Sequence, residues 1–427
     1  MEKKLPKGWV ETELGNFAFL KNGYAYKTTQ FQEYGIPILK ISNITKDGKV
    51  DISSPQYVDE SLLNESFLVR KGDIVIAMSG ATTGKFGIYN ADELLLQNQR
   101  VGNIKLYSDN LGNKKFLFYL ISSLKQEIED KAYGGAQPNI SSSLIESIQI
   151  GLPTLPEQER IVAKLDKLFA QHENIKKALE RIPQLLKNFR QQVLTQAPSG
   201  EETLLKNIGV WKGGGTPSKS NNDFWENGDI LWITAKDMKG IFISDSLDKI
   251  THKGVNESST NLIPKNSILI VTRSGILRRI LPISSNIKET TVNQDLKALI
   301  PYEGFNYKYL LYALNGKEED IRNQCMKSGT TVESIEFDRL KNYTIPVPPL
   351  QEQQEIVRRV ESLFAKADAI EMRYQKLKEK VDTLPQAILH KAFKGELVPQ
   401  LPTDGDAKDL LEEIIALKQE VKGKKKR

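Results

Sequence analysis

The feature that most constrains the fold is a heptad pattern of apolar residues that occurs twice. Residues 155–170 read LPEQERIVAKLDKLFA and residues 350–365 read LQEQQEIVRRVESLFA, so the second copy starts 195 positions after the first. In both copies the apolar positions advance by alternating steps of four and three, which is the spacing of a coiled-coil seam. With a rise of 1.5 Å per residue, each seam would be on the order of 50 Å long. So long and narrow a stripe requires a partner helix, and each copy can serve the other.

The two seams keep the same register throughout. The first is expected to comprise Ile161, Leu165, Leu168, His172, Ile175, Leu179, Ile182, Leu186, Phe189 and Val193. The second is expected to comprise Ile356, Val360, Leu363, Ala367, Ile370, Tyr374, Leu377, Val381, Leu384 and Ile388. His172 is the polar member of the first seam, and we expect it to act in packing or in fixing the register. The alternative, a core helix within each domain, is less favoured because the registers match.

The expected helices have suitable starts, but each contains an interior proline. Pro156 and Glu157 lie in the first turn of the first copy, where a missing N–H and a negative charge are favourable. Pro183 and Pro385 lie well inside the two helices. An interior proline removes a backbone hydrogen bond, so both should kink or break the helix.

The regions that precede the two helices also correspond, more faintly. Short β-branched runs bounded by Gly, Pro, Asn or Asp predict strands in both regions. The paired segments are FQEYGIPILKISNI (31–44) with FWENGDILWITAKDM (224–238), and VRKGDIVIAMSG (69–80) with IPKNSILIVTRSG (263–275). Asn98-Gln99 also matches Asn293-Gln294 at the offset of 195. An amphipathic helix is expected near 113–132 in the first region and near 306–326 in the second.

These patterns predict an α+β protein with two α/β domains, each followed by a long helix. The loops between the expected strands differ greatly between the two halves. A repeated scaffold with divergent loops suits a protein that reads two different targets. The expected boundaries are 1–152 for the first domain, 153–201 for the central spacer helix, 202–346 for the second domain, 347–400 for the C-terminal spacer helix, and 401–427 for a charged tail with a short helix.

Composition places the chain among soluble globular proteins. Of its 427 residues, 39% are hydrophobic and 27% are charged, and Cys325 is the single cysteine. One cysteine excludes a disulfide framework and suits a reducing cytoplasm. No stretch approaches 18 uncharged apolar residues, so we expect a cytoplasmic protein with no membrane partner. The net charge of +6 permits a polyanionic partner without requiring one.

No catalytic motif withstands inspection. SGATTGKF (79–86) resembles a phosphate loop, but Gly80 and Gly84 are too close, and Phe86 stands where Ser or Thr should bind Mg²⁺. WKGGGTPSK (211–219) lacks the expected ending and is typical of a flexible turn. The three histidines and one cysteine lie far apart, so no metal site is expected. These observations indicate a reader, not a catalyst.

Short motifs in both halves carry a family resemblance. They are GIPILKISNI, KGDIVIAMSG, AQPNISSS, LPTLPEQERIV, GGGTPSKSNNDFW, IPVPPLQEQQEIV and AFKGELVPQ, and they span the chain except the tail after about residue 405. Together they resemble the specificity subunit of type I restriction–modification systems. The resemblance implies a non-catalytic subunit whose two target-recognition domains bind the two halves of a bipartite, asymmetric site in double-stranded DNA. It also implies that the long helices pack as an antiparallel coiled coil with internal pseudo-two-fold symmetry.

The resemblance further implies the partners and their cofactors. Two modification (methyltransferase) subunits would use S-adenosylmethionine to methylate adenine N6, after flipping the base from the stack. Two restriction (helicase-nuclease) subunits would translocate and cut unmodified DNA with ATP and Mg²⁺. No cofactor is expected in this chain itself. Antiparallel helices would separate the two domains on the scale of one DNA turn, about 34 Å, so they would act as a spacer.

Residues that read DNA are expected on loops of the two domains. Phosphates attract charged side chains, and base edges require hydrogen-bonding side chains. The candidates are Lys27, Thr28, Ser79, Thr82, Thr83, Lys85, Gln99 and Arg100 in the first domain, and Lys219, Ser220, Lys236, Arg273, Ser274, Arg278 and Arg279 in the second. RSGILRR (273–279) is the densest local cluster. The alternative for each residue is a solvated surface charge, which is also our interpretation of the terminal KGKKKR (422–427).

Two rival functions remain open on the sequence. A coiled-coil scaffold that joins partner subunits without reading DNA would explain the seams but not the divergent loops. A fused enzyme would require a cofactor motif, and the sequence contains no recognisable one.

Overall fold

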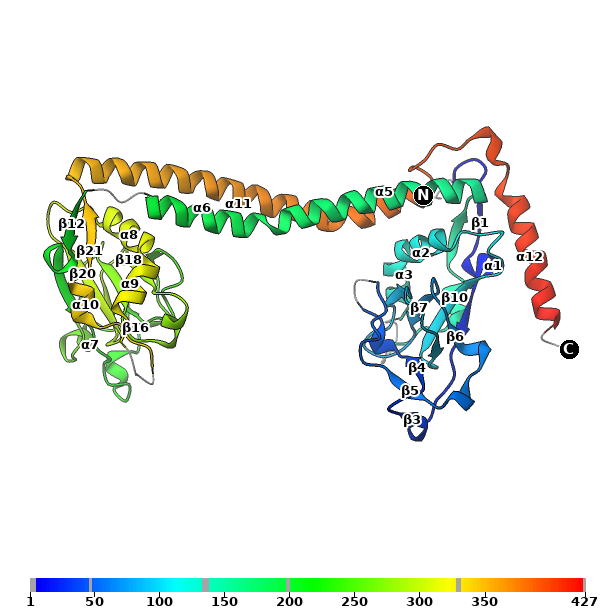
Figure 1. Ribbon diagram of the computed structural model, residues 1–427, viewed down its shortest axis with the longest axis horizontal. Coiled ribbons are helices and arrows are strands. Elements are labelled where there is room, and N and C mark those ends of the chain that lie inside the picture. The colour runs from blue at the N-terminus through cyan, green and yellow to red at the C-terminus, as the bar shows by residue number, and fades with distance from the viewer. Residues whose placement is uncertain (1–4, 46–47, 133–137, 197–199, 328–331, 425–427) are drawn as a thin grey trace. The chain divides into compact units, whose positions relative to one another are not determined.

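The computed structural model of the protein describes residues 5–45, 48–132, 138–196, 200–327 and 332–424. It divides into two compact units: unit 1 comprises Met1–Ala178 and Lys378–Arg427, and unit 2 comprises Leu179–Leu377. Each unit contains a globule and a stretch of both long helices (Figure 1). This division cuts across the helices, whereas the sequence suggested boundaries between globules and helices.

The globule of unit 1 contains two sheets, and its first and last strands pair with each other. β1 (Val10–Glu13) is antiparallel to β11 (Gln149–Leu152). The first sheet has the order β2-β10-β7-β8, with β2 (Ala18–Asn22), β10 (Val101–Leu106), β7 (Ile74–Ala77) and β8 (Phe86–Ile88). The second has the order β3-β5-β4-β9-β6, with β3 (Phe31–Gln32), β5 (Gln56–Val58), β4 (Ile36–Leu39), β9 (Leu95–Gln97) and β6 (Leu68–Val69). The strands expected within 31–44 and 69–80 are present.

Two helices of unit 1 share a hydrophobic core with its first sheet. Phe116, Leu120 and Ile128 are buried from α2 (Lys114–Ser123) and α3 (Lys125–Ala132), in one core with strands β7 and β10. The single helix expected over 113–132 is therefore wrong. Leu124 interrupts it, because its N–H bonds to the carbonyls of both residues 120 and 121 and tightens the turn. The remaining elements are α1 (Leu14–Phe17), α4 (Ser142–Glu146), η1 (Thr28–Gln30), η2 (Ile41–Asn43), η3 (Glu60–Leu62) and η4 (Glu65–Phe67).

The globule of unit 2 repeats this plan. β12 (Glu201–Leu204) pairs antiparallel with β21 (Thr344–Val347). One sheet has the order β13-β20-β17-β18-β15, with β13 (Gly209–Gly213), β20 (Leu296–Pro301), β17 (Ile268–Val271), β18 (Ile283–Asn286) and β15 (Phe242–Ile243). The other has the order β16-β14-β19, with β16 (Asp248–Ile250), β14 (Ile230–Ile233) and β19 (Thr290–Val292). Strands β14 and β17 match the expectation for 224–238 and 263–275.

The helices of unit 2 also match those of unit 1. The helix expected over 306–326 is again two helices, α8 (Tyr307–Gly316) and α9 (Glu318–Cys325), because Lys317 closes α8 with bonds from its N–H to the carbonyls of Ala313 and Leu314. The other elements are α7 (His252–Asn256), α10 (Phe337–Lys341), η5 (Leu205–Asn207), η6 (Asn222–Phe224) and η7 (Gly275–Arg278).

The repeated EQ motif at the start of each long helix has a specific structural role. Gln158 and Gln353 are buried, and the Nε2 of each donates to the carbonyl of the proline five residues earlier, at 3.1 and 2.8 Å. Their Oε1 atoms accept from the backbone N–H groups of Asn113 and Asn306, at 3.1 and 2.8 Å. Those two asparagines are the N-caps of α2 and α8. Each glutamine therefore ties a long helix to its own globule, which explains why this motif occurs twice.

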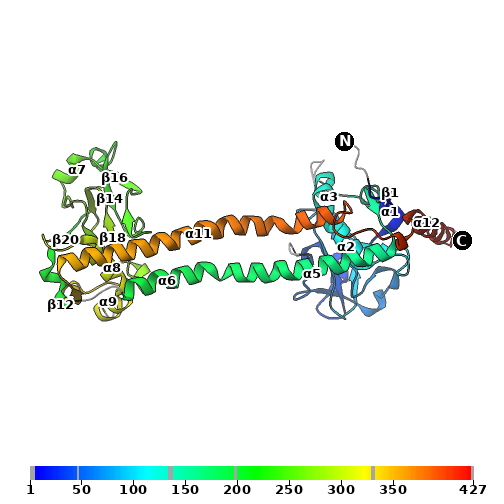
Figure 2. The same cartoon turned by 90° about the horizontal axis from the view of Figure 1, so that it is seen from above.

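The long helices are α5 (Leu155–Glu180), α6 (Ile182–Gln196) and α11 (Leu350–Ala392), and they pack antiparallel in each unit (Figure 2). In unit 1, Ile161 of α5 shares a core with Ala392 at the end of α11, while His172 further along α5 reaches Val381. In unit 2, Arg190 of α6 forms ion pairs of 2.7 Å with α11. The antiparallel helix pair expected from the resemblance is confirmed.

The two interior prolines have different outcomes. The expectation that Pro183 breaks its helix is confirmed, since α5 ends at residue 180 and α6 begins at Ile182. The corresponding expectation for Pro385 is wrong to the extent that α11 continues through it without interruption. Pro385 leaves the carbonyl of Val381 without its usual partner four residues on. The Nε2 of His172 lies 2.8 Å from that oxygen and replaces the missing donor. His172 thus compensates for the hydrogen bond that Pro385, on the opposite helix, cannot donate.

The seam positions are buried to different extents. The buried members are Ile161, Leu165, Leu179, Leu186, Val360, Ala367 and Val381, and the half-buried ones are Leu168, His172, Ile182, Val193, Ile356, Leu363, Tyr374 and Ile388. Contrary to expectation, the structure leaves exposed Ile175, Phe189, Ile370, Leu377 and Leu384. A pair of helices covers only the sides that face each other. Apolar residues outside the heptad, such as Val357 and Leu389, pack against the globules instead.

The C-terminal segment contains the helix expected within the charged tail 401–427. η8 (Pro402–Asp404) leads into α12 (Ala407–Lys424), which packs on α1 and β1 of unit 1. Ile414 is buried in this contact, and the N–H of Ala407 donates to the carbonyl of Gly8 at 3.0 Å. Arg160 of α5 holds Asp404 through a bidentate ion pair. The prediction for KGKKKR falls partly outside the described residues.

Candidate nucleic-acid interface

Unit 2 contains a polar hollow of about 760 Å³ at the ends of its strands. Four of the seven residues predicted to read DNA in this half line it: Lys219, Lys236, Arg273 and Ser274. Its other polar lining residues are Thr234, Asp248, Asn293, Gln294 and Asp295. The hollow therefore joins three cations with amide and carboxylate side chains, which combines groups suited to phosphates with groups suited to base edges.

The cations of this hollow are held by the fold. Arg273 follows directly after the turn from β17, where its backbone N–H donates to the carbonyl of Asp295 at 3.2 Å. Lys219 lies over two indole rings, with Nζ 5.9 Å from the ring centroid of Trp225 and 6.0 Å from that of Trp232. The Trp232 Nε1 donates to the carbonyl of Gly215 at 3.0 Å, so the ring beneath the ammonium is fixed. Such cation–π contacts keep the charge available at the surface.

Three of the predicted residues of unit 2 do not line the hollow. Ser220 is exposed and hydrogen-bonds through its hydroxyl to Ser218 at 2.8 Å. Arg278 lies on η7 and forms an ion pair with Glu333, which holds the pKa of that carboxyl below its ordinary value. Arg279 is exposed beside it. The RSGILRR segment is therefore divided: Arg273 and Ser274 line the hollow, Leu277 is buried, and Arg278 and Arg279 are not part of the lining.

Unit 1 contains a smaller hollow of about 390 Å³, lined by three predicted residues, Ser79, Gln99 and Arg100. The remaining lining residues are Asn22, Met78, Asn139, Ile140, Ser141 and Ser142. Gln99 and Arg100 are exposed, whereas the Ser79 hydroxyl is buried and makes no hydrogen bond to any residue that the structure describes. Amide, hydroxyl and guanidinium groups thus converge at one place.

The other predicted residues of unit 1 lie elsewhere. Thr83 is buried, and its hydroxyl lies 2.6 Å from the carbonyl of Gly80, so it builds the turn and does not face solvent. Thr82 is half-buried in the same turn. Lys85 lines a different pocket, between the globule and the helix pair of this unit. Lys27 and Thr28 are exposed at η1, outside the hollow.

The two hollows occupy equivalent positions in the repeat. Ser79 and Ser274 are 195 residues apart, and so are Gln99 and Gln294. Gln294 and Asn293 were not among the sequence candidates, although the same offset had already related them to Gln99 and Asn98. The signal that identifies them is therefore the repeat itself, applied to a residue already proposed in the other half.

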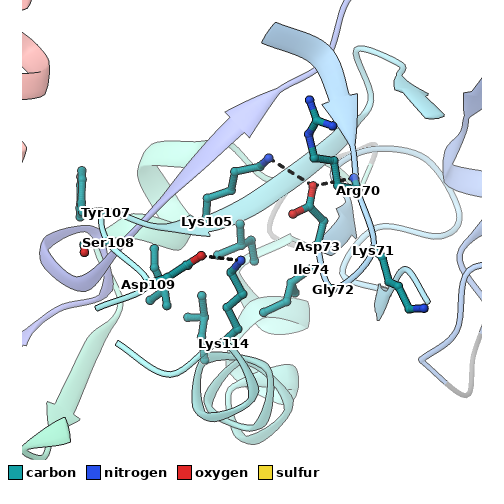
Figure 3. A pocket seen from close by; sticks show the side chains of 13 residues that line it. Arg70, Lys71, Gly72, Asp73, Ile74, Lys105, Tyr107, Ser108, Asp109 and Lys114 are labelled. Atoms are coloured by element: carbon teal, nitrogen blue, oxygen red, sulfur yellow. Dashed lines mark hydrogen bonds and ion pairs between the residues drawn. The ribbon is translucent and has the colours of Figure 1, made fainter. Parts of the chain in front are cut away.

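A third pocket, of about 390 Å³, carries basic residues but is internally neutralised (Figure 3). Lys105 forms an ion pair of 3.2 Å with Asp73, and Lys114 one of 2.8 Å with Asp109. The Arg70 backbone N–H donates to Asp73, while its guanidinium points away from this carboxylate. Lys71 also forms an ion pair of 2.8 Å, with Asp92 outside the lining. Three of the four cations of this pocket are therefore paired, and it is a weaker candidate for binding a polyanion than the two hollows.

The part of the chain that the structure describes gives little support to three other kinds of feature: a metal site, a membrane-spanning helix and a reactive cysteine. That part contains no group of three or more His, Cys, Asp or Glu placed to hold a metal ion. Its helices include none long and apolar enough to cross a membrane. Cys325 is buried, and burial raises the pKa of its thiol to about 11, so it is a poor nucleophile at neutral pH.

Comparisons with known proteins agree with this organisation. The model of the type I restriction modification DNA specificity domain matches residues 6–184 and 201–379. The chain is 31% identical to the type I restriction enzyme StySPI specificity subunit of Salmonella potsdam, over 99% of this chain and 98% of that protein. It is 38% identical to the EcoR124I/EcoR124II specificity subunit of Escherichia coli, over 58% of this chain and 63% of that protein.

A solved structure supports the fold. The HsdS subunit from Thermoanaerobacter tengcongensis superposes with a TM-score of 0.64 at 21% identity, and the match covers 92% of this chain and 98% of that one. The two matches to the family model together span most of the sequence. The chain belongs to the family of type I restriction–modification specificity subunits.

Proposed function

We propose that this chain recognises a bipartite, asymmetric site in double-stranded DNA, with each globule reading one half through its hollow. The observation that carries the proposal is that two hollows lie at equivalent positions of a repeat but are lined by different side chains. An identical lining would read two identical half-sites. A different lining on the same scaffold reads two different ones.

The proposal includes the partners of the complex. Two modification subunits would carry S-adenosylmethionine and methylate adenine, and two restriction subunits would carry the ATP- and Mg²⁺-dependent activities. This chain would be non-catalytic and would act in the cytoplasm, where it directs these partners to their site.

The experiment measures DNA binding by the full chain in complex with its modification subunit. The recognised motif is first read from methylated adenines in DNA from cells that express the complex, and affinity is then measured by fluorescence anisotropy on a duplex carrying that motif. We expect Arg273→Ala with Lys219→Ala to lower affinity roughly 5- to 150-fold and to reduce its salt dependence, because both cations line the hollow. Loss of a phosphate contact alone would weaken all sequences equally.

Two further variants sharpen this test. Arg339→Ala is a matched control, since Arg339 lies on α10, is paired with Glu336 and lines neither hollow. Arg278→Ala with Arg279→Ala should affect one half-site only, and less than the first pair, because Glu333 already neutralises Arg278. If the wild-type complex bound no duplex DNA, the scaffold interpretation would replace ours.

A further inference from the structure

One register position carries opposite charges in the two hollows. Arg100 and Asp295 are 195 residues apart, and each directly follows the Asn-Gln pair that the two halves share. Arg100 lines the hollow of unit 1, and Asp295 lines the hollow of unit 2. The scaffold is thus conserved within the molecule at this point while the side-chain chemistry is inverted.

The backbone around the two residues is the same. The carbonyl of Arg100 accepts from the N–H of Met78 at 2.9 Å, and the carbonyl of Asp295 accepts from the N–H of Arg273 at 3.2 Å. Met78 and Arg273 are themselves 195 residues apart. The turn that precedes β10 and the turn that precedes β20 are also closed by equivalent bonds, of 2.9 and 3.3 Å, to the carbonyl of the shared asparagine. The side chains of Arg100 and Asp295 therefore extend from equivalent backbone positions.

Most of the hydrogen-bonding positions of the Asp295 carboxylate are not used by other residues of the protein. Its Oδ2 accepts from the Asn293 Nδ2 at 3.2 Å, and it forms no ion pair with any described residue. An ionised carboxylate can accept about four hydrogen bonds, so most of its capacity is left. Asp295 is half-buried beside a surface whose other charged groups include Arg273, Lys219 and Lys236.

A carboxylate in a DNA-facing hollow cannot contact phosphates favourably, because like charges repel. It can contact a base edge only where that edge donates a hydrogen bond. In the major groove the N4 amino group of cytosine is the donor that Asp and Glu accept from, whereas Arg donates to O6 and N7 of guanine. The hollow of unit 2 is therefore suited to the cytosine of a G·C pair, and the hollow of unit 1 to the guanine.

We propose that Asp295 and Arg100 are the specificity-determining residues at this position, Asp295 accepting from cytosine N4 in one half-site and Arg100 donating to guanine O6 and N7 in the other. The inference rests on the proposed function and deepens it. It assigns part of the asymmetry of the recognised site to this pair of residues and gives each half-site a G·C pair, read at its cytosine in one half-site and at its guanine in the other.

The experiment uses the full chain with its modification subunit and duplexes that carry altered bases. Each cytosine of one half-site is replaced in turn by 2-pyrimidinone, which lacks the 4-amino group, and each guanine of the other by 7-deazaguanine, which lacks N7. For the wild-type complex, one 2-pyrimidinone position should lower affinity about 5- to 150-fold. Asp295→Ala should remove the difference between cytosine and 2-pyrimidinone at that position and leave the other half-site unchanged. Arg100→Ala should do the same for one 7-deazaguanine position.

Asp295→Asn keeps the size of the side chain and provides a variant that perturbs folding little. Asp109→Asn is the matched control, since Asp109 pairs with Lys114 in the pocket of Figure 3 and should leave base discrimination unchanged. The inference is overturned if Asp295 variants weaken all duplexes equally, which would mean that Asp295 only orients Arg273. It is also overturned if both half-sites lose discrimination together. If the wild-type complex shows no sequence preference, the proposed function fails and not this assignment alone.

Discussion

The helix pair of unit 1 and the helix pair of unit 2 contain equivalent sequences but solve the same problem differently. Each has a proline inside a long helix, Pro385 in unit 1 and Pro183 near the start of α6. Helix α11 continues through Pro385, whereas the helix that precedes Pro183 is interrupted at Arg181, between α5 and α6. At Pro385 the carbonyl of Val381, which the proline leaves without its helical donor, lies 2.8 Å from the Nε2 of His172 on the opposite helix.

The difference teaches that a helix-interior proline is not by itself a helix breaker. Its cost lies largely in the carbonyl that it leaves unpaired, and a donor on a neighbouring helix can satisfy that group. At Pro183 the structure instead ends one helix and begins another. The charged contacts differ as well. In unit 1 a bidentate Arg160–Asp404 ion pair joins α5 to η8, while in unit 2 the half-buried Arg190 of α6 contacts the exposed Asp368 and Glu371 of α11.

The largest effect is expected from His172→Leu, which keeps the seam apolar but removes the donor to Val381. Leaving this carbonyl unpaired should destabilise the helix pair of unit 1 by about 1 to 3 kcal/mol. Hydrogen exchange followed by mass spectrometry should show faster exchange in residues 378–392, with little change in unit 2. Pro385→Ala restores a backbone N–H at that site, so the double variant should recover most of the loss. If the effects of the two substitutions were additive, His172 would not be compensating for Pro385, and the contrast between the two helix pairs would be wrong.

The next largest effect concerns Arg160 and Asp404. The hydrogen bond that Arg160 donates to the Asp404 carboxylate holds the pKa of Asp404 below its ordinary value. The group therefore contributes stability that is present above the unfolded-state pKa, about 3.9, and lost as pH falls through the lower folded-state pKa. We expect Asp404→Asn to cost about 1 to 2 kcal/mol at neutral pH and to flatten the acid limb of a thermal-unfolding series. An unchanged acid limb would show that the pair does not anchor the C-terminal segment.

The smallest effect is expected from Arg190→Ala in unit 2. Its partners Asp368 and Glu371 are exposed, so solvent and salt screen both ion pairs, and the loss should be below about 1 kcal/mol. The measurement is the thermal midpoint at low and at high salt, where the variant and the wild type should converge. A loss as large as that of His172→Leu would mean that charge, not the pairing of the carbonyl, distinguishes the two helix pairs.

Much of the fold could be predicted from periodicity and from the repeat. Heptad spacing predicts the long helices, and β-branched runs predict β7 and β17, because both signals arise from local side-chain patterning. The break at Leu124 could not be predicted in this way, since the residues before and after it keep an amphipathic pattern. The role of His172 depends on Val381 on another helix and has no local signal.

The candidate site was predicted in part, for a similar reason. Residue type and loop position identify Arg273 and Gln99 as available to DNA, and the structure places each in a hollow. Residue type also selects Thr83 and Arg278. Thr83 is buried and cannot reach DNA, and the charge of Arg278 is neutralised by its ion pair with Glu333. Burial and ion pairing are tertiary properties, so counting basic residues in a segment such as RSGILRR overestimates its exposed charge.

The pairing of β1 with β11 and of β12 with β21 has a consequence for how such chains diversify. Because the first and last strands of a globule are neighbours, the chain enters and leaves each globule at the same place. A crossover that replaces everything between two such strands would exchange one globule as a cassette. The glutamines that attach the long helices, Gln158 and Gln353, lie outside that cassette. A lineage could therefore acquire a new half-site in one recombination event while the helices that follow remain as they were.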